Sequence, residues 1–217
     1  ERVQKSLREK ETLLRELYHR TKNNMAVIIA LLGLQAETFE DARLKEAFAE
    51  AQHRIRSMAL VHQKLYDAQD LSRLNLKEYI QDLVPMLVES YRILPTRIRF
   101  IPEMEDVFVL IDSAIPVGLI LSELLSNTLK YAFPDNREGE IRIELHRTTG
   151  GEIHLWVADN GVGVAKNYDF RQDGHLGTQN IFMLGEGQLQ GRVVFDTQHQ
   201  GVACGLQFHD IYYHQRV

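Results

Sequence analysis

The sequence predicts an α+β protein in which a helical hairpin over residues 1–68 precedes a layered domain of helices and strands over residues 76–217. Residues 1–68 contain no proline and one glycine, and their apolar residues recur in steps of three and four, as on helices. From residue 97 onward, short runs alternate apolar and polar residues, as strands do, with helical stretches between them. This change of period predicts a domain boundary at 69–75.

Two apolar stripes define the hairpin. The first contains Leu13, Leu17, Arg20, Asn24, Val27, Leu31 and Leu34, and the second contains Leu44, Phe48, Ala51, Ile55, Met58, His62 and Leu65. Alternating steps of four and three are typical of packed helices. The stretch 38–41 interrupts the pattern, and either Thr38 or Asp41 is suited to cap the second helix. A turn near residue 39 brings His62 close to His19.

One hairpin offers too little apolar surface for a stable core of its own. Two hairpins packed as a four-helix bundle would bury both stripes. We therefore expect a homodimer in which residues 1–68 form half of a four-helix bundle. Docking of the hairpin on the following domain is the alternative.

The second part is predicted to combine helices with a mostly antiparallel sheet. A helix over 76–91 is stopped by Pro95, and Pro116 opens a strongly apolar helix that runs to Tyr131. Strands are predicted over 97–101, 107–111, 140–146, 152–158, 192–196 and 205–212. Such a set of elements forms an α/β sandwich.

Composition limits the function classes. The net charge of −5 argues against nucleic acid as the main partner, because nucleic-acid binders carry a basic excess. The single cysteine, Cys204, excludes an internal disulfide and fits a reducing, cytoplasmic compartment. No apolar run approaches the roughly 20 residues that span a bilayer. The start is charged and helical, which predicts no signal peptide and further sequence before Glu1.

Six polar residues in a row, 19–24, interrupt the apolar face of the first helix, although no glycine or proline breaks the helix itself. We name this stretch, His-Arg-Thr-Lys-Asn-Asn, the polar break. Neutral imidazole is a nucleophile near neutral pH, and a reacting histidine has to be exposed. A lone helical histidine is more often an ordinary surface or core residue, so the polar break by itself leaves both interpretations open.

Three polar residues share one face of the apolar helix that follows Pro116. Glu123 and Asn127 are four residues apart and Lys130 follows three residues later, so their side chains are neighbours. The Asn127 amide oxygen is suited to hydrated Mg²⁺, and the Lys130 ammonium is suited to phosphate. A solvated helix face is the alternative interpretation.

Glycine-rich turns follow the predicted strand over 152–158. The first is Asp159-Asn160-Gly161-Val162-Gly163, in which the carboxylate can accept a hydrogen bond from a ligand amine and the glycines allow close approach. The second, 174–177, leads into a helix, where free backbone N–H groups suit phosphate. The polar stretch between them, 164–173, is predicted to be a mobile lid with Arg171 as its phosphate contact, and we name it the lid segment.

These motifs resemble the ATP-binding domain of sensor histidine kinases and their GHKL relatives. The resemblance rests on Glu-Leu-Leu-Ser-Asn-Thr-Leu-Lys-Tyr-Ala-Phe at 123–133, on Asp-Asn-Gly-Val-Gly at 159–163 and on the later glycine turn. The polar break, with Arg-Ile-Arg-Ser-Met-Ala-Leu-Val-His at 54–62, is similar to the phosphoacceptor hairpin of the His-Arg-x-Lys-Asn-Asn class. Nearly the whole chain takes part, with the motifs in the family's order.

The resemblance implies a role for each matching residue. In the hairpin, His19 would be the phosphoacceptor, and Glu16, by its place one turn earlier, would orient its imidazole or take its proton. In the ATP-binding domain, Glu123 would act as a base or polarise the metal's water, and Asn127 would hold Mg²⁺. Asp159 would bind the adenine amino group. The remaining implied contacts are Lys130 to phosphate, Tyr131 to the base or ribose, and Gly161, Gly163 and Gly177 as points of close approach.

Three positions depart from the family patterns. Arg20 stands where the commonest kinase class has an acidic residue after the histidine, so no phosphatase activity is inferred. Val157 and Ala158 follow Trp156, so the Trp-x-Glu signature of the HWE subgroup is missing and the chain is placed beside that subgroup. Val202 follows Gly201 where the family often has a threonine.

The sequence thus predicts a sensor histidine kinase core, which autophosphorylates His19 with ATP and Mg²⁺. The phosphoryl group would pass to an aspartate on the receiver domain of a response regulator, and a sensor domain would precede Glu1. A degenerate kinase that serves as a nucleotide-binding or partner-docking module is one alternative. A serine kinase or ATPase on the same fold is another, although anti-sigma-type serine kinases lack a hairpin with a histidine.

Overall fold

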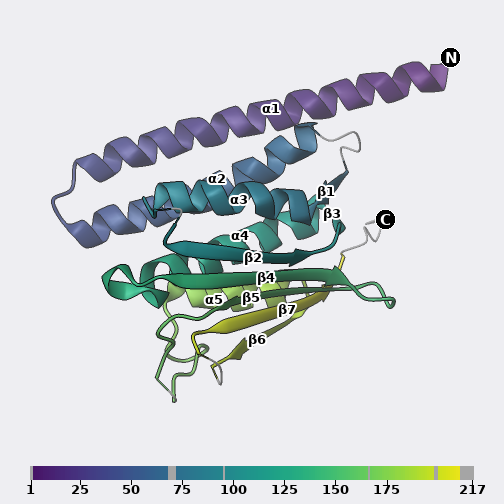
Figure 1. Ribbon diagram of the computed structural model, residues 1–217. Helices are drawn as coiled ribbons and strands as arrows, with labels where there is room; N and C mark the ends of the chain where they lie inside the picture. The colour runs from purple at the N-terminus through teal and green to yellow at the C-terminus, as the bar shows by residue number, and fades with distance from the viewer. Residues whose placement is uncertain (1, 68–71, 95, 166, 198–199, 211–217) are drawn as a thin grey trace. The chain divides into compact units, whose positions relative to one another are not determined.

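The computed structural model describes residues 2–67, 72–94, 96–165, 167–197 and 200–210. The chain divides into two compact units, Glu1–Leu74 and Asn75–Val217. The first consists of two long helices, and the second is built from helices and a five-stranded sheet (Figure 1). The predicted α+β class with an N-terminal helical hairpin is therefore confirmed. None of the helices in the described residues is both long and apolar enough to cross a membrane.

The hairpin consists of α1 (Arg2–Glu37) and α2 (Ala42–Asp67). Of the two predicted caps, Asp41 caps α2, because its carboxylate accepts a hydrogen bond from the Arg43 backbone N–H at 2.8 Å. The Thr38 hydroxyl instead donates to the Gln35 carbonyl at the end of α1, at 2.7 Å. The stretch 38–41 therefore ends one helix and begins the next.

Side chains from the two helices fix their register. The Gln52 amide donates to the Ile29 carbonyl at 2.8 Å, and a Cβ on Gly33 would lie only 3.0 Å from the same amide nitrogen. The single glycine of the hairpin thus leaves room for this contact. Nearer the polar break, the rings of Tyr18 and His62 lie 5.8 Å apart. His62 was predicted to lie close to His19, and its ring lies against that of Tyr18, the residue before His19.

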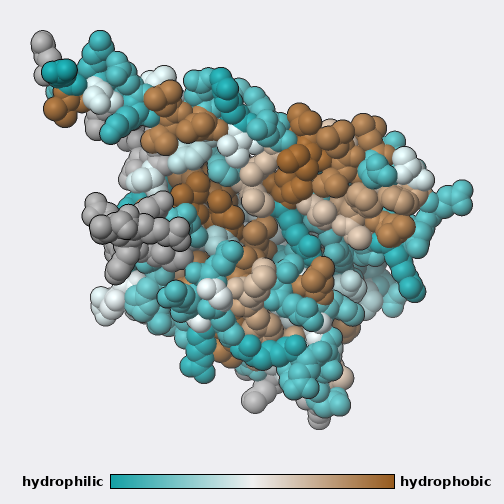
Figure 2. Space-filling model, turned by 180° about the vertical axis from the view of Figure 1, so that it is seen from behind, coloured by the Kyte–Doolittle hydropathy of each residue, from teal (hydrophilic) through white to brown (hydrophobic). Residues whose placement is uncertain are grey.

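Much of the apolar surface of α1 is exposed. Seven of its leucine, valine and isoleucine side chains have exposed fractions between 41% and 63%, and they are Leu13, Leu14, Leu17, Val27, Ile28, Leu31 and Leu34. Figure 2 shows apolar side chains gathered over the hairpin towards its turn. The polar break separates this surface into a part before residue 19 and a part after residue 24.

The second unit is a mixed sheet with helices on one face (Figure 1). Its strands run in the order β2-β4-β5-β7-β6, with β2 and β4 parallel and the other pairs antiparallel. The strands of this unit are β2 (Ile98–Met104), β3 (Phe108–Leu110), β4 (Gly139–Arg147), β5 (Glu152–Asp159), β6 (Arg192–Asp196) and β7 (Ala203–His209), while β1 (Arg73–Asn75) spans the boundary between the two units. The helices are α3 (Leu76–Ser90), α4 (Ile111–Asn127) and α5 (Leu176–Phe182), with π-helical turns η1 (Thr128–Ala132) and η3 (Met183–Gln188) and a short 3₁₀ turn η2 (Pro134–Asn136).

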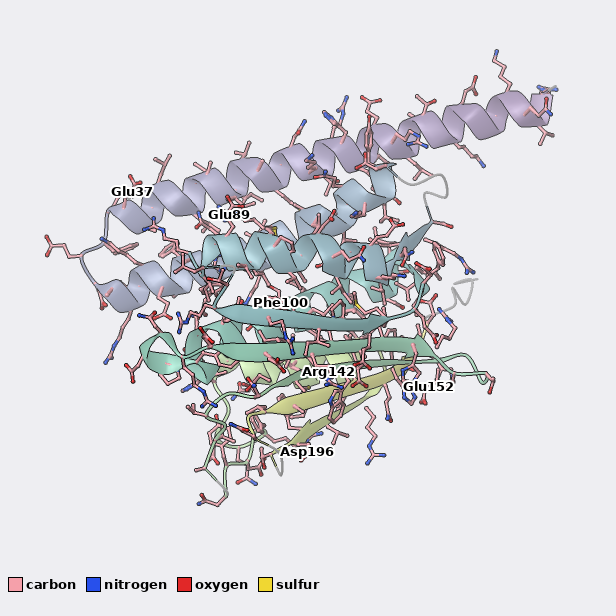
Figure 3. The ribbon with its side chains drawn as sticks, in the orientation of Figure 1. Glu37, Glu89, Phe100, Arg142, Glu152 and Asp196 are labelled. Carbon is pink, nitrogen blue, oxygen red and sulfur yellow. The ribbon has the colours of Figure 1, made fainter. Side chains whose placement is uncertain are left out.

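Alternation along the central strands separates the core from solvent. Residues 141, 143 and 145 of β4 and 153, 155 and 157 of β5 are buried, while their neighbours are more exposed. The open face has charged residues such as Arg142 (Figure 3). Arg142 forms an ion pair with Glu103 at 3.2 Å. On the same face, steps of two lead along β5 from residue 157 to the half-buried Asp159, and along β7 through 204, 206 and 208 to the buried Asp210. Each of these two core stripes therefore ends in a carboxylate.

The start of α4 differs from the prediction. The helix begins at Ile111, so Pro116 lies inside it, and the predicted strand over 107–111 is shortened to β3. The reason is a distant cap. The buried Asp210 carboxylate accepts hydrogen bonds from the Leu110 backbone N–H, at 3.3 Å, and from the Ser113 hydroxyl, at 2.7 Å. Pro95 and the end of the last predicted strand, 211–212, lie outside the described residues.

The Asp210 cap yields a stability prediction. Replacing Asp210 with alanine should lower the free energy of unfolding of the second unit by about 1.5–3 kcal/mol, because a charged acceptor is lost while its donors stay buried. Urea unfolding followed by the fluorescence of Trp156, the single tryptophan, which lies on β5, measures this unit. Glu103→Ala, which removes an exposed ion pair, is the control and should cost less than about 1 kcal/mol. Equal losses in both variants would contradict the assigned cap.

Candidate active site

The end of α4 positions the first group of predicted site residues. Glu123 is buried on α4 and Asn127, one turn later, is half-buried at the last residue of the helix. The chain then continues as the π-helical turn η1, which has Lys130 and Tyr131. Such widened turns occur frequently at functional sites. The structure therefore keeps Glu123, Asn127 and Lys130 on consecutive turns, with Glu123 the most buried.

Lys130 lies beside two aromatic rings. Its ammonium is 6.0 Å from the centroid of the Tyr91 ring and 5.9 Å from that of Tyr131. These are cation–π distances. Tyr91 follows α3 and was not among the predicted site residues. Tyr131 is 59% exposed, so its ring is accessible to a ligand.

Asp159 is the last residue of β5, and it lies next to the end of α4. Its Oδ1 accepts hydrogen bonds from the backbone N–H groups of Gly161, at 2.8 Å, and Val202, at 3.4 Å. Its Oδ2 accepts one from the Thr128 hydroxyl at 3.4 Å. Burial raises the pKa of the Asp159 carboxyl, and these hydrogen bonds offset part of the rise. With Oδ1 doubly engaged and Oδ2 holding one long hydrogen bond, Oδ2 is the oxygen better placed for a ligand amine.

Glycines surround the Asp159 carboxylate because a side chain would not fit there. A Cβ on Gly161 would overlap the Ala132 backbone, and one on Gly201, where φ is +93°, would overlap Asp159 itself. Gly163, at φ +69°, faces Gly201. Gly201 was named in the sequence only as part of a departure from the family pattern, yet it packs closer to Asp159 than Gly163 does. Gly177 lies apart from this group, in the first turn of α5.

Two contacts of the Asp159 turn lie outside the predicted set. Asn160 does not face a ligand: its side chain accepts a hydrogen bond from the Glu140 backbone N–H at 2.8 Å. The Arg137 guanidinium donates to the Asn160 carbonyl at 3.1 Å, and its charge lowers the pKa of Asp159. Arg137 and Thr128 are thus the site residues that sequence reasoning missed. Two signals in the sequence pointed towards Thr128. It directly follows Asn127, and Val202 stands where the family often has a threonine with its hydroxyl.

Side chains of the lid segment attach it to neighbouring elements. The Phe170 ring stacks on Phe195 of β6, with centroids 4.0 Å apart and an interplanar angle of 10°. Arg171 was predicted to contact phosphate, but its guanidinium donates to both carboxylate oxygens of Glu186 and lies 4.1 Å from the Phe182 ring centroid. The hydrogen bonds from Arg171 lower the pKa of Glu186. The described part of the segment, 164–165 and 167–173, is therefore attached to η3 and β6.

In the first unit, His19 is exposed on α1, as a phosphoacceptor has to be. Its ring centroid lies 6.1 Å from that of Tyr66 on α2. The side-chain amide nitrogen of Asn23 (Nδ2), one turn later on α1, is 3.3 Å from Nδ1 of the imidazole. The other ring nitrogen, Nε2, has no hydrogen bond to the described residues and is accessible for chemistry.

Glu16 has a different partner from the one predicted. Its place one turn before His19 predicted that it would orient the imidazole or take its proton, but its carboxylate accepts two hydrogen bonds from the Arg20 guanidinium, at 3.1 and 2.5 Å. The spacing of four residues brings the opposite charges together on one face of α1. Glu16 therefore pairs with Arg20 in this structure, and Asn23 is the residue whose side chain hydrogen-bonds the His19 imidazole.

His62 is the other histidine of the hairpin near the polar break. It lies against Tyr18, and burial lowers the pKa of its imidazole. Its Nδ1 is buried without a hydrogen-bond partner among the described residues. A half-buried ring of this kind is a poorer phosphoacceptor than the exposed His19, because a nucleotide reaches it less easily, and the two residues can be distinguished by substitution.

The donor set fits Mg²⁺ that is held mainly by phosphates. No group of three or more His, Cys, Asp and Glu side chains among the described residues could hold a metal ion by itself. Mg²⁺ bound with a nucleotide keeps several waters and needs only one or two protein oxygens. The Asn127 amide, with the Glu123 carboxylate one turn earlier, meets that requirement.

Two family models match the chain. Residues 16–91 match a model described as histidine kinase, and residues 112–206 match the model of histidine kinase-, DNA gyrase B- and HSP90-like ATPases. His19 lies in the first match. Asn127, Asp159 and Gly177 lie in the second, whose family includes ATPases.

Curated relatives are sensor kinases. The sensor histidine kinase PdtaS of Mycobacterium tuberculosis is 31% identical over 210 residues, which cover 95% of this chain and 41% of the relative. The Blue-light-activated histidine kinase 2 of Erythrobacter litoralis is 24% identical over 182 residues, covering 80% of this chain and 50% of the relative. The chain thus spans half or less of the length of these relatives.

Solved structures share the fold. The histidine kinase domain of a blue-light activated histidine kinase from Erythrobacter litoralis superimposes with a TM-score of 0.67 at 19% identity, covering 92% of this chain and 94% of that one. The catalytic domain of the histidine kinase ThkA gives a TM-score of 0.53 at 20% identity, covering 64% of this chain and 96% of that one. Both likenesses confirm the arrangement of elements described above.

The Asp159 site yields an affinity prediction. The resemblance implies that Asp159 binds the adenine amine; Asp159→Asn should then weaken ATP binding by about 1.5–3 kcal/mol, because a charge-assisted hydrogen bond would be lost. Calorimetric titration of the full chain measures the change. Asp112→Asn, which alters an exposed carboxylate in the first turn of α4, is the matched control and should leave the affinity unchanged.

The same titration has a pH dependence with a definite sign. Because burial raises the pKa of Asp159, its ionised form is lost at a higher pH than that of an ordinary aspartate, and ATP affinity should fall as the pH is lowered. The phosphates of ATP titrate in both proteins, so the difference in pH slope between the wild type and Asp159→Asn isolates the carboxyl group. Identical slopes would argue against this role of Asp159.

The attachment of the lid segment yields a prediction of local mobility. Glu186→Gln removes the charge partner of Arg171, so amide hydrogen exchange over 167–173 should become several-fold faster than in the wild type. A non-hydrolysable ATP analogue should slow exchange in this segment, since bound phosphate offers Arg171 another anion. Glu138→Gln, at an exposed carboxylate, is the control. Exchange that responds to neither the substitution nor the nucleotide would show that the segment is not a lid.

Proposed function

We propose that this chain, which belongs to the histidine kinase family, is a kinase core that phosphorylates its own His19 from ATP. The observation that carries the proposal is the presence in one chain of an exposed imidazole at the polar break and a glycine-lined carboxylate site at the end of α4. The first supplies a nucleophile, and the second supplies a place for the adenine of ATP. Neither feature has a use in a purely structural protein.

The chemistry proposed for His19 is a direct phosphoryl transfer. The lone pair of Nε2 forms a bond to the γ-phosphorus of ATP, while the bond between that phosphorus and the bridging oxygen breaks and its electron pair leaves with ADP. The imidazole keeps the proton on Nδ1 during the transfer. The exposure of His19 allows the nucleotide-bearing unit to reach Nε2 without unfolding α1.

The residues of the second unit bind and orient the nucleotide. Asp159 takes the adenine amine, and the glycines at 161, 163 and 201 let the base approach the backbone. Lys130, held between two tyrosine rings, provides a cation for the phosphates. Asn127 would hold Mg²⁺, with Glu123 acting on its water, and the ion would neutralise charge on the transferred phosphoryl group.

The proposed partner is a response regulator. Phosphohistidine transfers its phosphoryl group readily, and an aspartate on a receiver domain is the acceptor that sensor histidine kinases serve. The relatives are sensor histidine kinases, which supports this assignment. Because ATP and such receivers are cytoplasmic, we place the reaction in the cytoplasm.

We further propose a homodimer through the hairpin. Seven exposed apolar side chains of α1 form a surface that water does not favour, and a second hairpin would cover it in a four-helix bundle. The polar break within that surface would leave His19 at the rim of the bundle, where a nucleotide can reach it. The assembly therefore agrees with the proposed chemistry.

The proposed function predicts that His19 is the labelled residue. With γ-labelled ATP, His19→Gln should abolish labelling of the chain while ATP binding is retained, because Asp159 and Asn127 are unchanged. His62→Gln is the matched control and should still be labelled, since His62 is half-buried and next to Tyr18. The label should be lost in acid and kept in alkali, as for phosphohistidine.

Other outcomes distinguish the alternatives. ATP binding without any labelling of the wild type would favour a degenerate kinase that only binds nucleotide or docks a partner. Acid-stable label that persists in His19→Gln would favour a serine kinase. Label on His62 alone would contradict the assignment of His19.

A further inference from the structure

The His19 imidazole can react in only one of its neutral forms. Attack by Nε2 requires a free lone pair on that nitrogen, so the single proton of the neutral ring has to sit on Nδ1. In water, histidine favours the opposite form, with the proton on Nε2. A hydrogen-bond acceptor next to Nδ1 changes this preference, and the residue that provides it sets the fraction of reactive imidazole.

Among the neighbours of His19, one residue is placed to accept a hydrogen bond from Nδ1. Glu16, the carboxylate of the preceding turn, is paired with Arg20, which itself stands where other kinases have an acid. From α2, Tyr66 faces the imidazole with its ring, at 6.1 Å, and Arg15 lies over that ring and donates to the Tyr66 carbonyl. Asn23 is the only side chain that hydrogen-bonds the imidazole within the described part of the chain.

We propose that Asn23 is the positioning residue that keeps the proton of neutral His19 on Nδ1 by accepting it with its amide oxygen. The proposal rests on the proposed phosphorylation of His19. In the structure the amide nitrogen Nδ2 of Asn23 lies 3.3 Å from Nδ1, and rotation of the amide by half a turn about its last bond places the oxygen Oδ1 there instead, without moving other atoms. In that orientation Nδ1–H donates to Oδ1, and the lone pair of Nε2 points to solvent.

The same hydrogen bond strengthens during the reaction. As Nε2 gives its electron pair to phosphorus and the bond to ADP breaks, positive charge develops on the ring and the Nδ1–H group becomes a better donor. An acceptor on Nδ1 therefore stabilises the transition state more than the ground state, which raises the rate and leaves nucleotide binding unchanged. The amide carries no charge, so it does not repel the incoming phosphates as a carboxylate would.

Three variants of the full chain test the proposal. Asn23→Leu keeps the size of the side chain and removes both hydrogen-bonding groups. Asn23→Asp keeps only acceptors, so it can hold Nδ1–H but cannot donate to the ring. Asn24→Leu makes the same change at the next residue, which lies about 100° around the helix, and serves as the control.

The first readout is the initial rate of His19 labelling at saturating ATP. Asn23→Leu should lower it by roughly tenfold or more, the factor that goes with a lost hydrogen bond to a developing charge, while the ATP concentration at half-maximal rate stays the same. Asn23→Asp should restore most of the rate, and Asn24→Leu should match the wild type. A purely structural role would not give rescue by an acceptor-only side chain.

The second readout is the protonation of the ring itself. Nitrogen NMR at a pH where the imidazole is neutral, with His19→Gln used to identify the signal among nine histidines, should report protonated Nδ1 in the wild type and in Asn23→Asp. Asn23→Leu should move the proton to Nε2. Folding of each variant is checked by its unchanged affinity for ATP.

Several results would overturn the proposal while leaving His19 as the phosphoacceptor. They are an unchanged rate in Asn23→Leu, an equal loss in Asn24→Leu, no rescue by Asn23→Asp, and an Nε2–H tautomer in the wild type. Absence of labelling in the wild type would instead contradict the proposed function. The two failures are therefore distinguishable.

Discussion

Helix α4 is held at both ends by carboxylates, and the candidate site depends on this arrangement. Asp159 and Asp210 each end a buried stripe on two neighbouring antiparallel strands, β5 and β7, and so lie at opposite ends of the sheet. Asp210 accepts from the N-terminus of α4, and Asp159 accepts from Thr128, the residue after its last turn. The helix with Glu123 and Asn127 is thus fixed lengthwise on the sheet by hydrogen bonds that a hydrophobic core alone, being non-directional, would not supply.

The two carboxylates differ in how far a ligand can reach them. Asp210 is 7% exposed, and it accepts hydrogen bonds from the Leu110 backbone N–H, which its two oxygens share, and from the Ser113 hydroxyl, so it serves the fold. Asp159 engages Oδ1 with two backbone N–H groups and leaves Oδ2 with a single long hydrogen bond from Thr128. A half-buried carboxylate with an under-used oxygen is suited to a ligand amine, because burial strengthens the hydrogen bond that the ligand makes. The cost of that burial is seen as the raised pKa of Asp159.

The fold was predictable where the signal is local. Period-two alternation located β4, β5 and β6, and the step of three and four located both helices of the hairpin. The start of α4 was missed because its cap, Asp210, comes from about a hundred residues away, where no local pattern can reveal it. Motifs located Asn127 and Asp159, but the contacts of Thr128 and Arg137 with the Asp159 turn bridge separate elements. The stacking of Phe170 on Phe195 joins separate segments and could not be read from the sequence.

The polar break shows how competition between neighbours decides a site. Spacing alone made Glu16 the natural partner of His19, since both lie within one turn of α1. Arg20 lies on the same face and is permanently charged, so it offers the Glu16 carboxylate a stronger partner than a neutral imidazole does. Replacing an acid by arginine after the phosphoacceptor therefore has two effects: it removes one acceptor and occupies another. The imidazole is left to an uncharged amide, which can hold the ring without adding negative charge where the phosphates of ATP have to arrive.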